Sequence, residues 1–218
     1  MPGGKPATWA TRLRSLDVRF VRSVLDVWPL CLRVLPDRPE EDVITFNLVQ
    51  FLRKDPLVRE WFHSVAFQYH PPGYESNGLA YSKGRIDVAV LQDPLAEGYL
   101  AYECKRLNVV RTDGRRSLAT EYVAEGLARF ITGQYAENLP VGCMLGYVLD
   151  GDVAHAASSV RARIVECDQD VALVMGPRDE AAIGAATRFS SRHRRVSGDG
   201  EIEIRHALLP CRQTGGGG

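Results

Sequence analysis

The chain of 218 residues contains only five cysteines, and none of them stands in a Cys-x-x-Cys pair. An odd number of widely spaced cysteines argues against a disulfide framework, and the missing Cys-x-x-Cys spacing argues against a structural zinc site. We therefore interpret Cys31, Cys104, Cys143, Cys167 and Cys211 as reduced thiols of a cytoplasmic protein.

Long apolar runs and nucleotide-binding motifs are also missing. No stretch approaches the roughly 20 apolar residues of a membrane span, and the N-terminus lacks the apolar core of a signal peptide. The sequence contains no GxxxxGK(S/T), GxSxG or GxGxxG motif, and its five histidines show neither HxH nor HExxH spacing. These absences disfavour membrane insertion, secretion, and P-loop, esterase, dinucleotide or histidine-based metal chemistry.

Charge of one sign is not in excess, because 27 lysines and arginines balance 27 aspartates and glutamates. A neutral total excludes a chain that is basic throughout, but it can hide unequal segments. Basic clusters occupy residues 1–34, 105–116 and 188–195. Most charge runs are solvated surfaces, so these clusters become candidate phosphate contacts only if other residues indicate a polyanionic ligand.

Hydrophobic residues make up 45% of the chain and charged residues 25%, the balance of a globular protein with a sizeable core. The length fits one α/β domain better than two. We expect a basic amphipathic helical extension at residues 1–36, a main domain at 37–210 and a flexible glycine-rich tail at 211–218.

Apolar residues recur at helical spacing from Thr11 to Leu35, with arginines between them, until Pro29 and Pro36 interrupt the pattern. This spacing predicts an amphipathic N-terminal helix. Its apolar stripe could dock on the main domain or on a partner protein, and its arginines could meet phosphate. Packing into the core of the same chain is the favoured interpretation of the stripe.

The remaining pattern alternates helices and strands. Residues 142–149 are nearly all apolar, which is typical of a central strand covered by helices on both faces. Strands at 85–91 and 99–105 are joined by a short polar connection and should pair antiparallel. Expected elsewhere are helices at 40–54, 117–136 and 153–165, strands at 62–69, 171–175 and 202–209, a turn-rich loop at 71–78 and a basic loop at 106–116.

The chemistry of the chain centres on Glu103 and Lys105. Residues two apart in a strand project from the same face, so these side chains should point together while Cys104 points away. Asp87 lies near the start of the preceding strand and joins them if the two strands pair in the expected register. Two carboxylates and a backbone carbonyl suit a hard cation such as Mg²⁺, and a neighbouring lysine can orient water or stabilise charge during phosphodiester hydrolysis.

The segment Gly84-Arg85-Ile86-Asp87, followed after fifteen residues by Glu103-Cys104-Lys105, resembles the bipartite motif of the PD-(D/E)XK (restriction-endonuclease-like) nuclease superfamily. The expected order of a helix, three antiparallel strands, a second helix and a further strand is similar to that of the superfamily over roughly half the chain. Ile86 stands where the motif has its nominal proline, a position that varies in the superfamily.

The resemblance implies a restriction-endonuclease-like core, an α/β fold with a central mixed β-sheet flanked by helices. It implies Mg²⁺-dependent endonuclease cleavage of DNA, with Mn²⁺ able to substitute for Mg²⁺. Asp87, Glu103 and the backbone carbonyl of Cys104 would be metal ligands, and Lys105 would be the catalytic lysine.

The superfamily often adds a carboxylate from the first helix as a further metal ligand. We prefer Glu41 to Glu40 for this role, because Glu41 lies three and seven residues before Ile44 and Leu48, on the core-facing side of the helix. Simple electrostatics at the positive end of a helix explains either glutamate equally well.

Residues of the second helix often line such a site too, which makes Glu125, Arg129 and Gln134 lesser candidates. The favoured explanation for them is structural: Arg129 pairs with Glu125 at i, i+4, and Gln134 caps the helix end. A nuclease must also approach a polyanion, so the basic cluster beside Lys105 is the best candidate for phosphate contact. The nucleic-acid-binding residues expected there are Arg106, Arg111, Arg115 and Arg116, with the arginines near His193 second.

We therefore expect a cytoplasmic, metal-dependent nuclease acting on DNA, with a role in bacterial anti-phage defence or restriction by analogy alone. The expected partners are DNA and either a second copy of the chain or a larger defence complex with an ATPase or sensor subunit, and no membrane is expected. RNA stays open as the alternative substrate. The alternative function is a catalytically idle, nuclease-like subunit that binds nucleic acid or assembles with a larger partner through its N-terminal helix.

Overall fold

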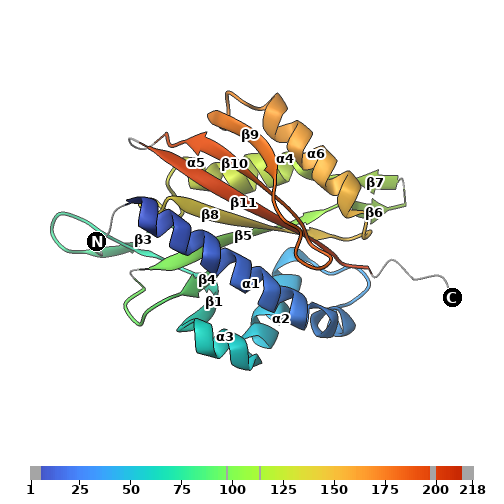
Figure 1. Cartoon of the computed structure of the whole chain (residues 1–218), viewed down its shortest axis with the longest axis horizontal. Coiled ribbons are helices and arrows are strands. Elements are labelled where there is room, and N and C mark those ends of the chain that lie inside the picture. The colour runs from blue at the N-terminus through green and yellow to red at the C-terminus, as the bar shows by residue number, and fades with distance from the viewer. Residues whose placement is uncertain (1–5, 97, 113, 197–199, 213–218) are drawn as a thin grey trace.

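Seven strands of the described chain form one mixed β-sheet in the order β1-β4-β5-β8-β11-β10-β9 (Figure 1). The computed structural model describes residues 6–96, 98–112, 114–196 and 200–212. β8 pairs in parallel with β5 and β11, and the other neighbours pair antiparallel. The strands are β1 (Ser64–Tyr69), β4 (Ile86–Leu91), β5 (Tyr99–Leu107), β8 (Val141–Val148), β9 (Leu173–Asp179), β10 (Thr187–Arg194) and β11 (Glu201–Pro210).

Two small antiparallel ladders lie outside this sheet. They are β2 (Pro72–Tyr74) with β3 (Ala80–Ser82), and β6 (Val109–Arg111) with β7 (Gly114–Arg116). The segments expected as loops at 71–78 and 106–116 therefore contain strands. In both ladders most side chains are exposed, so no alternation of apolar and polar residues marked them as strands in the sequence.

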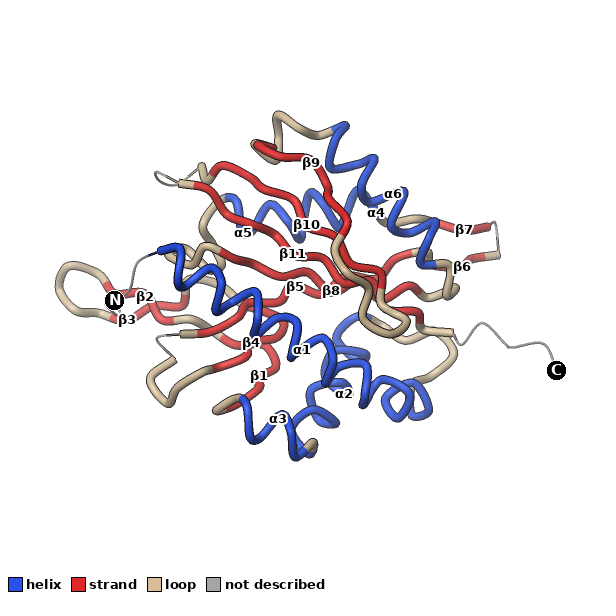
Figure 2. The backbone as a smooth tube through the Cα atoms, viewed as in Figure 1, coloured by secondary structure: helices blue, strands red, loops and turns tan. Residues whose placement is uncertain are grey.

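Helices cover both faces of the sheet, so the expected α/β architecture with a central mixed sheet is confirmed (Figure 2). In Figure 1, α1 crosses in front of the sheet, while α4 and α5 lie behind it. On β8, Tyr147 stacks on Trp28 of α1, whereas Gly146 faces Tyr122 on the other side. The helices are α1 (Pro6–Val34), α2 (Glu41–Lys54), α3 (Pro56–Trp61), α4 (Ala119–Glu121), the π-helix η1 (Tyr122–Leu127), α5 (Ala128–Ile131) and α6 (Val153–Glu166).

The helix α1 continues through Pro29, where an interruption was expected. A proline inside a helix removes one N–H donor and usually ends or kinks the helix. Here tertiary contacts hold the turn, because Trp28 stacks on Tyr147 and donates from Nε1 to the carbonyl of Pro210 at 2.8 Å. The apolar stripe of α1 is buried against the same chain, which confirms the core-packing interpretation.

A buried ion network also fastens α1 to the sheet. Asp17 accepts hydrogen bonds at Oδ2 from Arg188 (2.7 Å) and Arg205 (2.8 Å), and at Oδ1 from the hydroxyl of Tyr102 (2.8 Å). Burying charges is costly unless they are paired and hydrogen-bonded, as they are here. Arg188 is buried in this network and His193 is fully buried, so neither can contribute to the phosphate-binding surface considered at 188–195, whereas Arg194 is exposed.

The single helix expected at 117–136 is wrong in both length and regularity. A π-helical stretch of six residues lies between two short α-helices, and the last of these ends at Ile131. Leu118 (φ 59°) precedes the helix and Gly133 (φ 77°) follows it, so left-handed residues bound it at both ends. β10 was not predicted from the sequence, because it lies in the polar stretch before the last strand.

Residues near both ends of the described chain belong to the main core. Phe20 of α1 lies against Tyr102 of β5, with ring centroids 4.7 Å apart, so the extension expected at 1–36 shares the core of the domain. In the tail expected at 211–218, the N–H of Cys211 donates to the carbonyl of Val148 at 2.9 Å, and residues 213–218 lie outside the described residues. No helix in the described ranges is long and apolar enough to cross a membrane.

Candidate active site

The register of β4 and β5 brings two predicted site residues to the same place. Val88 of β4 faces Tyr102 of β5 in this ladder. The same register continued by one pair sets Asp87 opposite Glu103, on one face of the sheet. Both carboxylates are buried, since Asp87 is 5% exposed and Glu103 is 0% exposed.

The β4–β5 ladder ends at this point, and the side chain of Asp87 replaces its next rung. Oδ2 of Asp87 accepts a hydrogen bond of 2.8 Å from the backbone N–H of Cys104. In a strand, the N–H and C=O of one residue face the same neighbour, so the carbonyl of Cys104 also faces the β4 side. The side chain of Cys104 lies on the opposite face, beside Tyr147.

Glu103 lies between two cationic side chains. Its Oε1 accepts from Lys105 Nζ at 2.8 Å and from Arg129 Nη1 at 2.7 Å. Its other oxygen, Oε2, is buried and has no hydrogen-bond partner among the described residues. A buried carboxylate oxygen without a donor is costly, so this atom is available to a cation or to water.

Glu41 reaches the same cluster from the start of α2. Its Oε1 accepts from Lys105 Nζ at 3.0 Å, and its Oε2 accepts from the backbone N–H of Arg106 at 2.9 Å. Glu40 instead pairs with the Arg106 guanidinium at 2.7 Å, and its side chain is 72% exposed. Of the two glutamates weighed for this position, the structure therefore brings Glu41 to Lys105.

Burial shifts the protonation of the cluster. Burial and the neighbouring charge of Asp87 raise the pKa of Glu103 to about 7, although Lys105 and Arg129 oppose the shift. Burial also raises the pKa of Asp87. For Lys105, burial lowers the pKa, but the charges of Glu103 and Glu41 outweigh burial and raise it above its ordinary value. Lys105 is thus a permanent cation, and Glu103 changes charge near neutral pH.

The π-helix η1 packs directly on these side chains. A Cβ on Gly126 would lie 3.4 Å from the Cγ atoms of Glu103 and Lys105, and only 2.6 Å from Cε of Met144. Glycine at this position therefore lets the helix approach β5 closely. π-helical turns are frequent at functional sites, because they change which residues of a helix face a neighbour.

The lesser candidates on this helix are placed differently from expectation. Arg129 contacts Glu103, as well as the hydroxyl of Tyr135 at 2.9 Å, so the expected pairing with Glu125 is wrong. Glu125 is exposed, and it lines a large cavity that opens beside Lys105. Gln134 lies after the helix rather than in its last turn, and it lines a separate cavity of about 420 Å³.

Sequence reasoning missed Tyr135. Its hydroxyl donates to the backbone carbonyl of Arg85 and accepts from Arg129, so it links the start of β4 to the arginine that holds Glu103. Tyr135 is 1% exposed. No motif marks such a residue, because its position depends on where the helix ends.

A cavity of about 930 Å³ opens beside the cluster and is lined by Glu41 and Lys105. Three of the four arginines expected to bind nucleic acid, Arg106, Arg111 and Arg116, also line it. Three of the four arginines form ion pairs with carboxylates. Arg106 pairs with Glu40 and Arg116 pairs with Glu121. Arg115 pairs with Asp150 at 2.7 Å and with Asp152 at 3.1 Å. Arg115 therefore fixes the β6–β7 hairpin instead of facing the cavity.

The residues present fit a hard divalent cation in part. Asp87 and Glu103 are adjacent carboxylates, no described residue donates to Oε2 of Glu103, and the carbonyl of Cys104 faces the β4 side at the end of the ladder. Such oxygen atoms are the ligands that Mg²⁺ prefers. Within the described ranges, no group of three or more histidine, cysteine, aspartate or glutamate side chains is placed to hold a metal ion. The cation would thus need the backbone carbonyl, water or substrate oxygens to complete its shell.

Comparison of the chain with protein-family models, with curated proteins and with solved structures finds no match. Its function is therefore inferred from the residues and their geometry. The features that bear on it are the convergence of Asp87, Glu103 and Lys105, the contacts of Glu41 and Arg129 with them, and the adjoining cavity.

Proposed function

We propose that this chain is a metal-dependent nuclease of restriction-endonuclease-like fold that hydrolyses DNA phosphodiester bonds, with Mg²⁺ as cofactor and Mn²⁺ able to substitute. One observation carries the proposal: Asp87, Glu103 and Lys105 converge from two paired strands, and a buried oxygen of Glu103 has no donor among the described residues. The order of the elements that form and cover the main sheet also supports it. Apart from α3 and the two small ladders, α2 is followed by the antiparallel strands β1, β4 and β5, then by a helical segment and by β8, which is parallel to β5.

The residues that would hold the cation are Asp87, Glu103 and the backbone carbonyl of Cys104, with Glu41 able to join if it releases Lys105. A bound Mg²⁺ supplies Lewis-acid stabilisation of the charge on the phosphoryl oxygens. Since no described residue donates to Oε2 of Glu103, the carboxylate can bind a ligand there while Oε1 stays on Arg129.

Lys105 contributes a fixed positive charge beside the reacting phosphate. Because its pKa is raised, the ammonium cannot act as the general base; it orients the attacking water by hydrogen bonding or stabilises the charge that develops on phosphate. Glu41 and Glu103 hold Nζ from two sides, which positions the charge before substrate arrives. Arg129 and Tyr135 act as positioning residues for Glu103.

The proposal extends to a cytoplasmic role in anti-phage defence, in which the chain acts as a homodimer or with an ATPase or sensor subunit. A dimer suits double-strand cleavage because each site cuts one strand. The second candidate function is a catalytically idle, nucleic-acid-binding or assembly subunit. The observation in its favour is that both oxygens of Glu41, and Oε1 of Glu103, already have donors within the protein.

One assay separates the two candidates. Purified protein is incubated with supercoiled, linear and single-stranded DNA in Mg²⁺, Mn²⁺ or EDTA, beside Asp87→Ala and Lys105→Ala. Exposed residues without a described partner supply the matched controls, Asp170→Ala and Lys54→Ala. We expect cleavage that EDTA abolishes, that both site variants lower by at least about 100-fold, and that both controls preserve.

Two outcomes count against the proposal. Cleavage that persists in Asp87→Ala and Lys105→Ala would show that another site is responsible. Absence of cleavage by the wild-type chain with either metal, alone or with added partners, would favour the idle subunit.

A further inference from the structure

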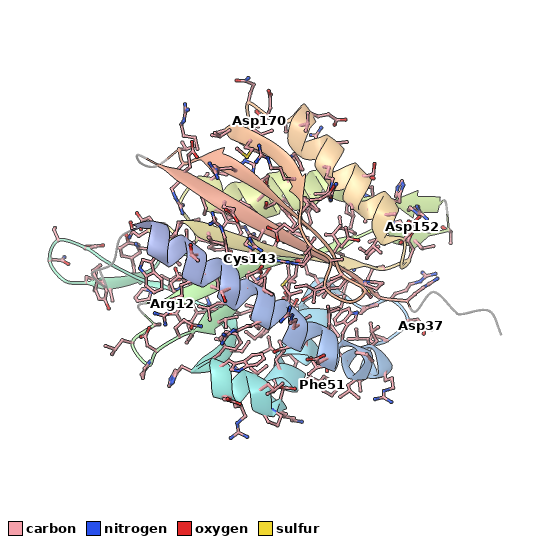
Figure 3. The ribbon with its side chains drawn as sticks, viewed as in Figure 1. Arg12, Asp37, Phe51, Cys143, Asp152 and Asp170 are labelled. Atoms are coloured by element: carbon pink, nitrogen blue, oxygen red, sulfur yellow. The ribbon has the colours of Figure 1, made fainter. Side chains whose placement is uncertain are left out.

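Three arginines from distant parts of the chain line the large cavity and have no carboxylate partner among the described residues. Arg38 follows α1, Arg111 ends β6 and Arg212 follows β11, and all three are exposed. Asp37 lines the same cavity, and Figure 3 shows it at one end of the molecule, with Asp152 above it. The same cavity reaches Lys105 of the candidate active site.

The other cations of the cavity are already neutralised by carboxylates. Lys105 pairs with Glu41 and Glu103, Arg106 with Glu40, and Arg116 with Glu121. Among the described lining residues, the carboxylates left without a partner are Asp37 and Glu125. The unpaired side chains of the described cavity lining are therefore three arginines and two carboxylates. Their net charge is positive, which favours the binding of an anion.

One wall of the cavity is held in place. Arg115 of β7 pairs with Asp150 at 2.7 Å and with Asp152 at 3.1 Å. Asn108, just before β6, donates to Asp150 at 3.0 Å. The β6–β7 hairpin is therefore tied to the chain after β8, which fixes the backbone that carries Arg111. A fixed backbone lowers the entropic cost of binding an anion through this side chain.

The lining also includes apolar residues. Leu32, Leu35, Pro36, Val109 and Leu149 contribute aliphatic surface to the same cavity as the arginines. A nucleic-acid strand carries phosphates that suit arginine and base faces that suit apolar contacts. In a duplex those faces are stacked and hidden, whereas a single strand exposes them.

The cavity is too small to enclose a duplex, and its volume suits one strand better. A volume of about 930 Å³ lies within the range of about 300–1,000 Å³ typical of small-ligand sites. A DNA duplex is far larger, because its major groove alone is about 12 Å wide and about 8.5 Å deep. A single strand, or an unpaired end of a duplex, can thread such a space.

We propose that Arg38, Arg111 and Arg212 bind the phosphates of a single-stranded DNA segment and lead it to Lys105. The inference rests on the proposed nuclease function and narrows its substrate to single strands or unpaired ends. It also names two residues, Arg38 and Arg212, that lie outside the basic cluster at 105–116.

The test is a binding measurement in EDTA, so that cleavage plays no part in it. Fluorescence anisotropy compares a labelled single strand of about ten nucleotides with the blunt duplex of the same sequence, on the full chain. The variants are Arg38→Ala, Arg111→Ala and Arg212→Ala, with Arg111→Lys to keep the charge. Arg59→Ala, on α3 and outside the cavity, is the matched control.

We expect the single strand to bind at least about tenfold more tightly than the duplex, and each alanine variant to weaken single-strand binding about 3- to 10-fold. Each should also reduce the slope of log affinity against log salt by about 0.7, the value for one phosphate contact on a single strand, while Arg111→Lys and Arg59→Ala keep the slope. Equal binding of duplex and single strand, or wild-type binding by all three alanine variants, would overturn the inference. Single-strand binding without cleavage in Mg²⁺ would instead refute the nuclease function and leave this binding site standing.

Discussion

The carboxylate of Asp87 accepts a hydrogen bond of 2.8 Å from the backbone N–H of Cys104, seventeen residues later in the chain. This bond stands where the next rung of the β4–β5 ladder would be, beyond Val88 and Tyr102. It holds the two strands together while leaving the carbonyl of Cys104 unpaired by the ladder. One side chain thus has two separable roles: closing the end of a ladder and supplying a carboxylate to the site.

The two roles of Asp87 predict different effects for two substitutions. Asp87→Asn keeps an oxygen that can accept from Cys104, so the fold should stay within about 1 kcal/mol of wild type, while DNA cleavage falls by at least about 100-fold. Asp87→Ala leaves a buried N–H without an acceptor and should cost about 1–3 kcal/mol in addition. Urea unfolding and a cleavage assay measure both effects. Cleavage at the wild-type rate by Asp87→Asn would show that the Asp87 carboxylate is not part of the active site.

Glu41 and Glu40 form a matched pair for testing the first helix. Glu41 contacts Lys105 and the N–H of Arg106, whereas Glu40 makes an exposed pair with the Arg106 side chain. We expect Glu41→Gln to lower cleavage by at least about tenfold and Glu40→Gln to change it less than about twofold. Initial cleavage rates at saturating Mg²⁺ provide the measurement. Equal losses in both variants would show that only the charge at the helix start matters.

Gly126 sets the distance between η1 and the site. Gly126→Ala places a Cβ 2.6 Å from Cε of Met144, so the buried methionine must move, and we expect a cost of about 1–3 kcal/mol and slower cleavage. Gly176→Ala in β9 is the control, because no described atom lies within 4 Å of its added Cβ. Thermal unfolding and cleavage rates are compared for both variants. Unchanged stability and activity of Gly126→Ala would mean that close approach of the helix is unnecessary.

The sequence predicted best those elements whose burial follows a regular period. The strands β4 and β8 were expected within one residue of their bounds, since nearly every residue in them is apolar and buried. β10 was not predicted because its buried positions include Arg188, Ser191 and His193. Their side chains form hydrogen bonds with Asp17, His206 and the carbonyl of Val171, which are distant in sequence. Burial of paired polar residues leaves no apolar pattern to read.

The residues of the candidate site were also predicted only in part from the sequence. Strand alternation alone placed Glu103 and Lys105 together, and the register of β4 then added Asp87. The expected pairing of Arg129 with Glu125 failed because the six residues of η1 follow i→i+5 bonding, which rotates later residues away from an i, i+4 neighbour. The orientation of Arg129 toward Glu103 therefore depends on a helix irregularity that no spacing in the sequence reveals.

Glu103 also predicts a pH dependence of stability in metal-free protein. Burial, with the charge of Asp87, raises its pKa from the ordinary 4.5 to about 7, so the folded state holds a proton that the unfolded chain has lost. The stabilisation from Glu103 is thus full below pH 4.5 and is lost as the pH rises through 7. Relative to Glu103→Gln, which does not titrate, wild type should lose roughly 3 kcal/mol of unfolding free energy between pH 4.5 and 8.

His193 provides the internal control for this series, because its sign is opposite. Burial lowers the pKa of His193 to about 4, despite the hydrogen bond with the carbonyl of Val171. Its contribution is present above pH 6.5 and is lost as the pH falls toward 4. Urea unfolding in EDTA between pH 4 and 8 should therefore show the wild-type-minus-variant difference falling with pH for Glu103→Gln and rising with pH for His193→Gln. A difference for Glu103→Gln that stays constant across this range would mean that Glu103 is ionised throughout, held by Lys105 and Arg129 against its burial.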